Sequence, residues 1–238
     1  MVRLAALGLL LAGLTGCQNI QTTATDTAHI RFIDASPDSP SLDIYQNGNA
    51  VAYNLGFGTI TSYVPLSPGA YTLTADAAGT RQTLVSAKQT LAVDHHYTAI
   101  VGNFAANLQE TILADQTMPA PSGQISVRII DQANRAGAVD IYLVPTSGKL
   151  ANTAPLATGV AFTANTGYIN VPVSNYALAV VPTGSVPVST TATLFTGPQV
   201  VYAAGTVLTV VLIDSPLASP PAVQAIVADD YDPSSVTM

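Results

Sequence analysis

The stretch from Ile30 to Tyr45 reads I-R-F-I-D-A-S-P-D-S-P-S-L-D-I-Y, and a second version, V-R-I-I-D-Q-A-N-R-A-G-A-V-D-I-Y, runs from Val127 to Tyr142. The two versions align without a gap at an offset of 97 residues, and six of the sixteen positions are identical. The identical pairs are Arg31/Arg128, Ile33/Ile130, Asp34/Asp131, Asp43/Asp140, Ile44/Ile141 and Tyr45/Tyr142. We interpret the chain as two copies of one module.

The composition around this repeat is typical of strands and turns. The chain has 238 residues, enough for two domains of about 100 residues each, and it combines 9% charged residues with no tryptophan. A strand-like run from Leu42 to Gln46 is followed by Asn47-Gly48, the dipeptide that most favours a tight hairpin, and similar short runs follow at close spacing. No window of ten or more residues shows the apolar recurrence of an amphipathic helix. We predict an all-β fold with two tandem immunoglobulin-like or transthyretin-like β-sandwich domains.

The repeat also sets the domain boundaries. We assign residues 28–114 to the first sandwich and residues 124–228 to the second. Residues 115–123, D-Q-T-M-P-A-P-S-G, contain two prolines and a glycine and are typical of a linker, so we expect limited contact between the modules. Residues 229–238 begin with two aspartates, and we expect an acidic, frayed tail.

The amino terminus has the layout of a secretory signal. Arg3 precedes an apolar run from Leu4 through Leu14, which is shorter than the roughly 20 residues that a transmembrane helix needs. Leu14-Thr15-Gly16-Cys17 resembles the lipobox of bacterial lipoproteins, and that resemblance implies residues 1–16 as signal peptide and a lipidated Cys17, the only cysteine. Residues 17–27 would then be the lipidated cysteine and a flexible tether. A non-lipidated signal peptide or a buried, inert cysteine are the alternatives.

This resemblance also predicts a place in the cell. Acyl chains on Cys17 would attach an exported protein to a membrane. Gln18 stands where an Asp would favour retention in the inner membrane, so the outer membrane is favoured, with the protein facing the periplasm or the surface.

The charged residues argue against some partners and leave others open. The formal net charge is −7 and there is no basic stripe, so we do not expect nucleic acid as a partner. The charged positions that both copies share predict structural ion pairs between neighbouring strands, with a ligand-binding arginine or a catalytic carboxylate pair as the alternative. These positions are Arg31, Asp34 and Asp43 in the first copy and Arg128, Asp131 and Asp140 in the second.

Neither catalysis nor metal binding has a convincing motif. No Gly-x-Ser-x-Gly elbow is present. Neighbouring strand residues point to opposite faces, so Asp94-His95-His96 favours a solvated turn over a metal site. Asp229-Asp230-x-Asp232 lacks the glycine and the distal glutamate of a calcium loop. We therefore expect no enzyme activity, no metal and no cofactor.

The first copy resembles the bacterial domain of unknown function 4397. The resemblance is carried by the opening pattern from Arg31 to Tyr45, the Asn-Gly turn, Gly56-Phe57-Gly58, Tyr63 and the Ser67-Pro68-Gly69-x-Tyr71 hairpin. It implies a β-sandwich that is exported or lipid-anchored and often occurs in tandem, with no established activity. The second copy lacks the Ala-Ser-Pro-Asp-Ser-Pro loop of the first. Because exposed loops often carry function, we regard Ser36, Pro37, Asp38, Ser39 and Pro40 as a candidate binding loop.

Three hypotheses for function follow. The first is a non-enzymatic, lipid-anchored cell-envelope protein whose two modules act as a structural or protein-interaction surface toward an unknown envelope protein. The second is a glycan-binding module that uses exposed tyrosines, of which the chain has ten in all. An uncharacterised envelope enzyme is the third.

Overall fold

The computed structural model describes residues 26–185, 193–215 and 223–233, and it confirms the all-β prediction. Three short 3-10 turns are the only helical elements of the described residues. The first half of the chain contains the strands β1 (Ala28–Asp34), β2 (Leu42–Gln46), β3 (Asn49–Leu55), β4 (Val64–Leu66), β5 (Gly69–Ala77), β6 (Thr83–Leu91), β7 (His96–Gly102) and β8 (Gln109–Asp115). The second half contains β9 (Gln124–Gln132), β10 (Val139–Pro145), β11 (Ala157–Val160), β12 (Asn165–Pro172), β13 (Asn175–Pro182), β14 (Phe195–Val201), β15 (Val207–Asp214) and β16 (Val223–Tyr231).

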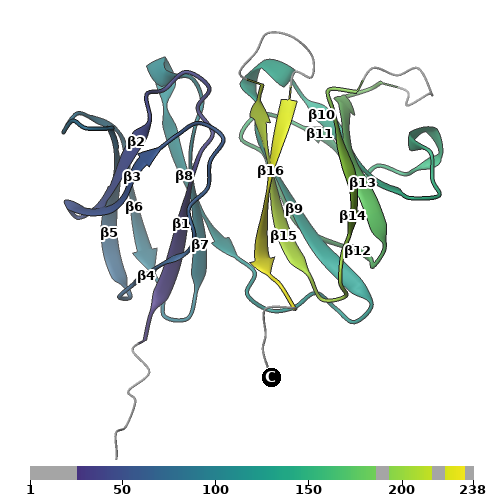
Figure 1. Ribbon diagram of the computed structural model, residues 1–238, viewed down its shortest axis with the longest axis horizontal. Helices are drawn as coiled ribbons and strands as arrows, with labels where there is room; N and C mark the ends of the chain where they lie inside the picture. The colour runs from purple at the N-terminus through teal and green to yellow at the C-terminus, as the bar shows by residue number, and fades with distance from the viewer. Residues whose placement is uncertain (1–25, 186–192, 216–222, 234–238) are drawn as a thin grey trace, which may run out of the picture.

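These strands form four sheets that lie one after another along the long axis of the molecule (Figure 1). The first half supplies an outer sheet, β3-β2-β5-β6, and an inner sheet, β4-β1-β7-β8. The second half supplies an inner sheet, β12-β9-β15-β16, and an outer sheet, β11-β10-β13-β14. Adding eight to each strand number of the first half gives the order of the second half. The repeat in the sequence is therefore also a repeat of strand order.

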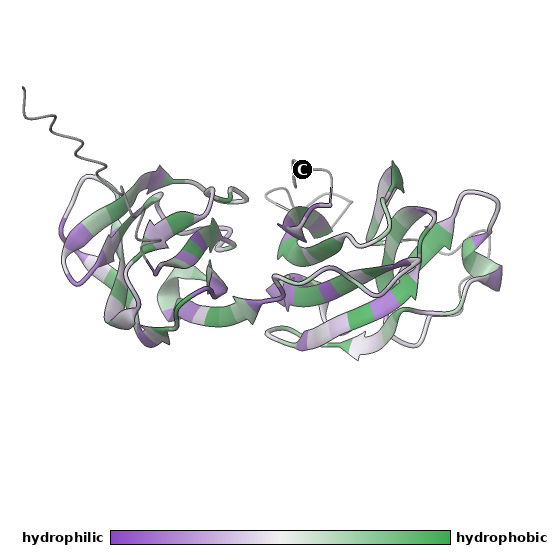
Figure 2. Ribbon diagram, turned by 90° about the horizontal axis from the view of Figure 1, so that it is seen from below, coloured by the Kyte–Doolittle hydropathy of each residue, from purple (hydrophilic) through white to green (hydrophobic). Residues whose placement is uncertain are grey.

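Each module has its own apolar core between its outer and inner sheets. In the first module Ile30 and Phe32 of β1 pack with Leu42 and Leu73 of the outer sheet, and all four are buried. A second cluster of the same kind, which includes Ile125, Val127, Ile129 and Val180, fills the second module. Side chains alternate between the two faces of a strand, and Figure 2 shows bands of hydrophobic and hydrophilic residues along the strands. The two cores account for one face of each inner sheet.

The other face of each inner sheet is buried as well, against the other module. Ile33 and Ile100 of the first module and Ile130, Val211 and Ile213 of the second form one apolar cluster. The centre of each inner sheet is a parallel strand pair, β1 with β7 and β9 with β15, and parallel strands are typically covered on both faces. Our expectation of limited contact between the modules is therefore wrong, because the inner strands carry apolar residues on both faces.

The structure also moves two of the expected boundaries. Asp115, assigned to the linker, ends β8 and is buried. The backbone N–H of Ala120 then donates to Gly205 O at 2.9 Å, so the linker contacts the second module. The expected acidic tail is wrong at its start, because β16 continues to Tyr231 and leaves Asp230 only 7% exposed. The pairing of β16 with β15 explains this burial.

Other expectations lie on parts of the chain that the structure does not describe. The signal peptide, Cys17 and all but the last two residues of the tether belong to residues 1–25, outside the described residues. Among the residues that are described, no helix has the length and apolar character needed to span a membrane. The Asn47-Gly48 hairpin turn is confirmed, with φ values of 47° and 82°.

Candidate functional site

Arg31 lies on β1 at the contact between the modules and is only 3% exposed. Its Nη2 forms an ion pair with Asp230 Oδ1 on β16 of the other module. Its Nη1 donates to the backbone oxygen of Asp229 at 2.9 Å, and its Nε donates to Thr98 Oγ1 on β7 at 2.9 Å. One guanidinium thus connects two strands of its own module with the last strand of the other.

Arg128 makes the same set of contacts in the opposite direction. Its Nη2 forms an ion pair with Asp115 Oδ1, on β8 of the first module, at 2.5 Å. Its Nη1 donates to Ala114 O at 2.9 Å and its Nε donates to Thr209 Oγ1 at 2.9 Å. We call the two arrangements the reciprocal arginine sites, because each module gives its arginine and receives its carboxylate from the other.

A tyrosine and a threonine complete each site. Asp115 Oδ2 accepts hydrogen bonds from Tyr63 OH at 2.8 Å and from Thr98 Oγ1 at 2.7 Å. In the twin site Asp230 Oδ2 accepts from Tyr168 OH at 2.8 Å and from Thr209 Oγ1 at 2.6 Å. These bonds satisfy the second oxygen of each carboxylate, so neither aspartate leaves an unpaired oxygen.

The tyrosine rings also cover the arginines. The Arg31 guanidinium carbon lies 4.6 Å from the centre of the Tyr63 ring, and Arg128 lies 4.7 Å from Tyr168. A cation over an aromatic face is attracted by the ring quadrupole. Burial and the neighbouring aspartates raise the pKa of both phenols. The phenols therefore stay protonated at neutral pH and act as hydrogen-bond donors.

The shared arginines are thus ion-paired, but the expected partners are wrong. Arg31 and Asp34 are three positions apart on one strand, and alternation turns them to opposite faces. Asp43 lies on the outer sheet and Arg31 on the inner one. The same geometry separates Arg128 from Asp131 and from Asp140. The partners are Asp115, in the predicted linker, and Asp230, in the predicted tail.

Asp43 and Asp140 accept hydrogen bonds from neighbouring N–H and O–H groups. Asp43 Oδ1 accepts from the backbone N–H of Asn54 at 2.8 Å, and its Oδ2 accepts from that of Gly79 at 2.9 Å. Asp140 Oδ1 likewise accepts from Gly159 N at 2.8 Å and from Thr183 Oγ1 at 3.0 Å. Both aspartates therefore fix the neighbouring strand, β3 or β11, and a turn, the one after β5 or after β13.

Asp34 and Asp131 have a different environment at the ends of β1 and β9. Each is fully buried, and each Oδ1 accepts a hydrogen bond from a backbone N–H two residues later, that of Ser36 or of Ala133. Within the described part of the chain, each Oδ2 has no hydrogen-bond partner. Burial raises the pKa of both carboxyls to about 7. These two groups are half-protonated near neutral pH.

The candidate binding loop from Ser36 to Pro40 is partly built into the fold. Ser36 is buried, whereas Pro37 and Ser39 are half-buried and Asp38 and Pro40 are exposed. Asp38 Oδ1 accepts from the backbone N–H of Ala105 at 2.8 Å, which fastens the loop to the turn before β8. The binding role proposed for this loop stays a prediction.

The histidines divide between a turn and a strand. His95 is exposed and its Nδ1 lies 2.8 Å from Val93 O. His96 begins β7 and is half-buried, so a solvated turn describes only the first of the pair. Its ring centre lies 4.7 Å from that of His29 and 4.7 Å from that of Tyr63. The residues that the structure describes contain no group of three potential metal ligands.

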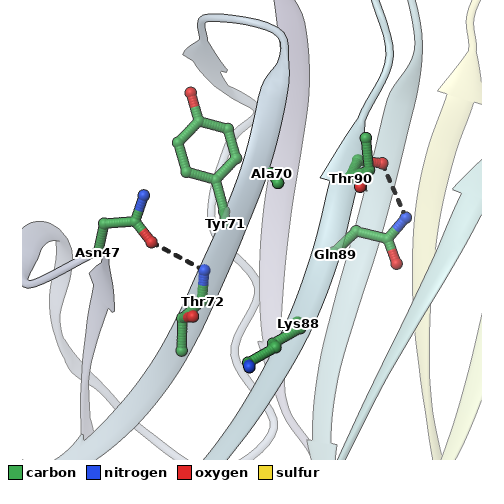
Figure 3. Close-up of a pocket in the computed structure, with 7 residues that line it drawn as sticks. All are labelled: Asn47, Ala70, Tyr71, Thr72, Lys88, Gln89 and Thr90. Carbon is green, nitrogen blue, oxygen red and sulfur yellow. Dashed lines mark hydrogen bonds between the residues drawn. The ribbon is translucent and has the colours of Figure 1, made fainter.

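Among the hollows on the surface, the one beside Tyr71 is polar and has a volume of about 420 Å³ (Figure 3). It lies over β5 and β6 next to the β2–β3 turn, and its lining is Asn47, Ala70, Tyr71, Thr72, Lys88, Gln89 and Thr90. The corresponding tyrosine of the second module, Tyr176, lines a hollow of about 280 Å³ whose other residues are Leu143, Ala154, Pro155, Leu156, Ile169, Val171 and Pro172. The polar hollow is thus a feature of the first module.

Sequence reasoning missed Asp115, Asp230, Thr98 and Thr209 as members of the arginine sites. The sequence does contain one indication of these sites. The strand-like run Val207–Asp214 has apolar residues on both faces and includes a single threonine. Such a run indicates a strand that is covered on both sides. A buried arginine on such a strand needs a carboxylate from elsewhere.

A comparison with protein families gives one match, which covers part of the chain. Residues 28–142 match the family described as "Domain of unknown function (DUF4397)". This region begins with β1 and ends inside β10, so it contains both versions of the repeated stretch. A search of curated proteins finds no match.

Comparison with solved structures finds distant matches, including the following two. A family 26 carbohydrate-binding module from Eubacterium rectale, solved with maltoheptaose, is 13% identical, with 85% of this chain and 96% of that chain covered and a TM-score of 0.25. A putative cell adhesion protein from Bacteroides fragilis is 8% identical, with 86% and 97% covered and a TM-score of 0.18.

Proposed function

We propose that the protein is a non-enzymatic, lipid-anchored cell-envelope protein whose two β-sandwich modules act together as a structural or protein-interaction surface. The observation that carries this proposal is the pair of reciprocal arginine sites. Charged residues that occupy the same position in both copies of a repeat are common candidates for catalysis or ligand binding. Here the two repeated arginines, Arg31 and Arg128, are buried in ion pairs with Asp230 and Asp115. Their role is to fix one module against the other.

The proposal includes the second half of the chain as another module of the same kind. Its support is the one-to-one correspondence of strands β1–β8 with β9–β16 together with the repeated arginine, aspartate and tyrosine residues. Two joined modules present their loops as one rigid body. A partner that contacts both modules would then meet a surface that needs no ordering on binding.

The anchor rests on the lipobox and on the position of Cys17. The test is radiolabelled palmitate incorporation in a bacterial host that processes lipoproteins, followed by separation of the inner and outer membranes. Label on the wild-type chain and none on Cys17→Ala, with the protein in the outer-membrane fraction, is the expected result. Label that persists in Cys17→Ala would overturn the anchor assignment.

The non-enzymatic part of the proposal has a separate test. The purified protein is incubated with envelope substrates such as peptidoglycan fragments, esters and phosphoesters, and product is measured. Turnover that is lost in Asp34→Asn or Asp43→Asn would show an enzyme and reject this part. Asp38→Asn, on the exposed loop, serves as a matched carboxylate control.

A second candidate, a glycan-binding module, is favoured by one surface of the first module. Tyr53 is 69% exposed and its ring meets that of Tyr45 edge to face, with centres 6.4 Å apart. The Arg81 guanidinium carbon lies 4.8 Å from the centre of the Tyr45 ring, and Tyr45 itself is only 6% exposed. Exposed aromatic rings stack on sugars, so a glycan array is the test. Hits that disappear in Tyr53→Ala support this candidate, and an array without hits removes it.

A further inference from the structure

We propose that His29 and His96 form a binding site for a divalent transition-metal ion such as Cu²⁺. The two histidines lie on β1 and β7, the parallel strand pair at the centre of the first inner sheet (Figure 1). The proposed function assigns no role to these residues, so this inference goes beyond that function and does not depend on it.

The register of the two strands brings the side chains together. His29 and His96 are partners across β1 and β7, and their ring centres are 4.7 Å apart. Arg31 lies two positions further along β1 and contacts the second module, so both rings lie on the face of the sheet that is turned to that module. His95, the sequence neighbour of His96, lies in the exposed turn before β7. The fold therefore pairs His96 with a histidine of another strand.

The separation of the two rings fits two ligands of one metal ion. An imidazole nitrogen binds such an ion at about 2.0–2.1 Å, which places the ring centre about 3.2 Å from the metal. Two ring centres that are 4.7 Å apart then subtend an angle of roughly 95° at a shared ion. Neighbouring ligands in the square-planar or tetragonal geometry of Cu²⁺ are separated by nearly this angle. The backbone thus already holds the rings at a separation that a shared ion requires.

Both rings also have a nitrogen without a partner. Nδ1 of His29 and Nδ1 of His96 are buried, and neither has a hydrogen-bond partner among the described residues. A buried polar atom without a partner is uncommon, and a bound ion is one explanation for it. Imidazole must be neutral to bind a metal. Burial, together with the nearby His29 and Arg31, lowers the pKa of His96, so His96 is neutral near pH 7.

The surroundings of the pair allow a cation to enter. Both histidines are half-buried and lie near the end of the sheet at which β1 begins. The described residues form no group of three metal-binding side chains, so water would complete the coordination of the ion. Arg31, the nearby cation, is ion-paired with Asp230 and lies 4.0 Å from Asp115. Its positive charge is therefore compensated.

The second module has no counterpart of this histidine pair. The repeat places Ser126 at the position of His29, and the strand register places Val207 opposite Ser126. Both residues are buried, and Ser126 Oγ donates to Asn170 Oδ1. A hydrogen bond and an apolar side chain thus occupy this end of the second inner sheet. We expect one metal ion for each chain.

The test is calorimetric titration of the full-length protein in detergent with copper(II) chloride, and with the chlorides of nickel, zinc and magnesium in parallel. We expect Cu²⁺ to bind more tightly than Ni²⁺ or Zn²⁺, and Mg²⁺, which prefers oxygen ligands, not to bind. His29→Gln and His96→Gln should each weaken Cu²⁺ binding about tenfold or more. The matched control is His95→Gln, which removes the third histidine of the chain and should leave the affinity unchanged.

Electron paramagnetic resonance of the copper-loaded protein identifies the ligands directly. Two imidazole nitrogens are expected in the wild type and in His95→Gln, and at most one in His29→Gln or His96→Gln. The wild-type spectrum decides the question even if a variant does not fold. Copper should also raise the urea midpoint of the wild type more than that of His29→Gln, because an ion that binds only the folded state stabilises it.

Several outcomes would overturn the inference. These are no binding of Cu²⁺, a wild-type spectrum with fewer than two imidazole nitrogens, or a loss of affinity in His95→Gln as large as that in His96→Gln. Loss of binding in Cys17→Ala would also overturn it, because the thiol would then be the ligand.

Discussion

The two reciprocal arginine sites are nearly alike, and they differ in one further contact of the arginine Nη2 atom. Arg128 Nη2 donates to Thr209 Oγ1 at 2.7 Å in addition to its ion pair. Arg31 Nη2 instead lies 4.0 Å from Asp115, the carboxylate of its own module, in addition to its ion pair with Asp230. Otherwise arginine, threonine, tyrosine and exchanged aspartate match one for one. The arrangement is that of an isologous interface between two identical subunits, formed here within one chain.

The largest expected effect comes from removing one arginine. Arg31→Met leaves Asp230 buried without its cation, whereas Arg128→Met removes the nearer of two cations from Asp115 and leaves Arg31 Nη2 4.0 Å from Asp115 Oδ2. Breaking a buried ion pair from one side costs about 3–5 kcal/mol, so urea denaturation should show a loss of this size in each variant. The loss should be the larger in Arg31→Met, because Arg31 faces both aspartates. Arg81→Met, which removes an exposed arginine over Tyr45, is the control and should lose less than about 1 kcal/mol. A loss that small at Arg31 would contradict the assignment.

Removing both members of one pair should restore much of this loss. Arg31→Met combined with Asp230→Leu replaces the buried ion pair with apolar groups, which proteins often tolerate. A double-mutant cycle should give a coupling energy on the order of 2–3 kcal/mol between Arg31 and Asp230. The cycle between Arg31 and Asp131, which are not in contact, should give a value near zero. Comparable values in the two cycles would sink the pairing.

The two tyrosines offer a milder comparison. Tyr63→Phe and Tyr168→Phe keep the ring over the arginine and remove the hydrogen bond to the aspartate. A hydrogen bond to a charged group contributes about 1.5–3 kcal/mol, so both variants should lose stability in that range by thermal or urea unfolding. Tyr71→Phe removes an exposed bond to Ser67 O and should lose less. Equal losses in all three variants would argue against a special role for the arginine sites.

The remaining prediction concerns pH and the buried carboxyls at the ends of β1 and β9. The pKa of Asp34 and of Asp131 is raised to about 7 by burial, above the value of about 3.9 in an unfolded chain. The folded protein therefore binds more protons between about pH 4 and pH 7, and stability is lost as the pH rises through this window.

Measured by urea unfolding, the protein should thus be more stable at pH 5 than at pH 8, by about 2–3 kcal/mol for each carboxyl. Asp34→Asn with Asp131→Asn should flatten this dependence. Burial lowers the pKa of His96, which opposes the trend as the pH falls through the usual histidine range. His96→Gln should therefore steepen the dependence. A pH profile that Asp34→Asn and Asp131→Asn leave unchanged would contradict the assignment.

The sequence predicts the strands well because strand formation is local. Alternating apolar residues, the Asn47-Gly48 turn and the repeat specify β-sandwich modules without any knowledge of long-range contacts. The interface between the modules was not predicted, because it depends on which face of β1 and β9 the other module covers. Adjacent apolar residues such as Ile129 and Ile130 indicate two covered faces, and we interpreted only one. Asp230 follows another aspartate near the end of the chain, a context that favours solvent until strand pairing buries it.

The arginine contacts join residues that are far apart in the sequence, and this separation affects the order of folding. Arg31 and Asp230 are 199 residues apart, and β1 must wait for β7 before its inner sheet can form. Contacts between residues so distant in sequence slow folding, because loop closure comes before any gain from packing. The interface is complete only when the last described strand is in place. A chain that is still being synthesised therefore lacks this interface until nearly all of its residues have been made.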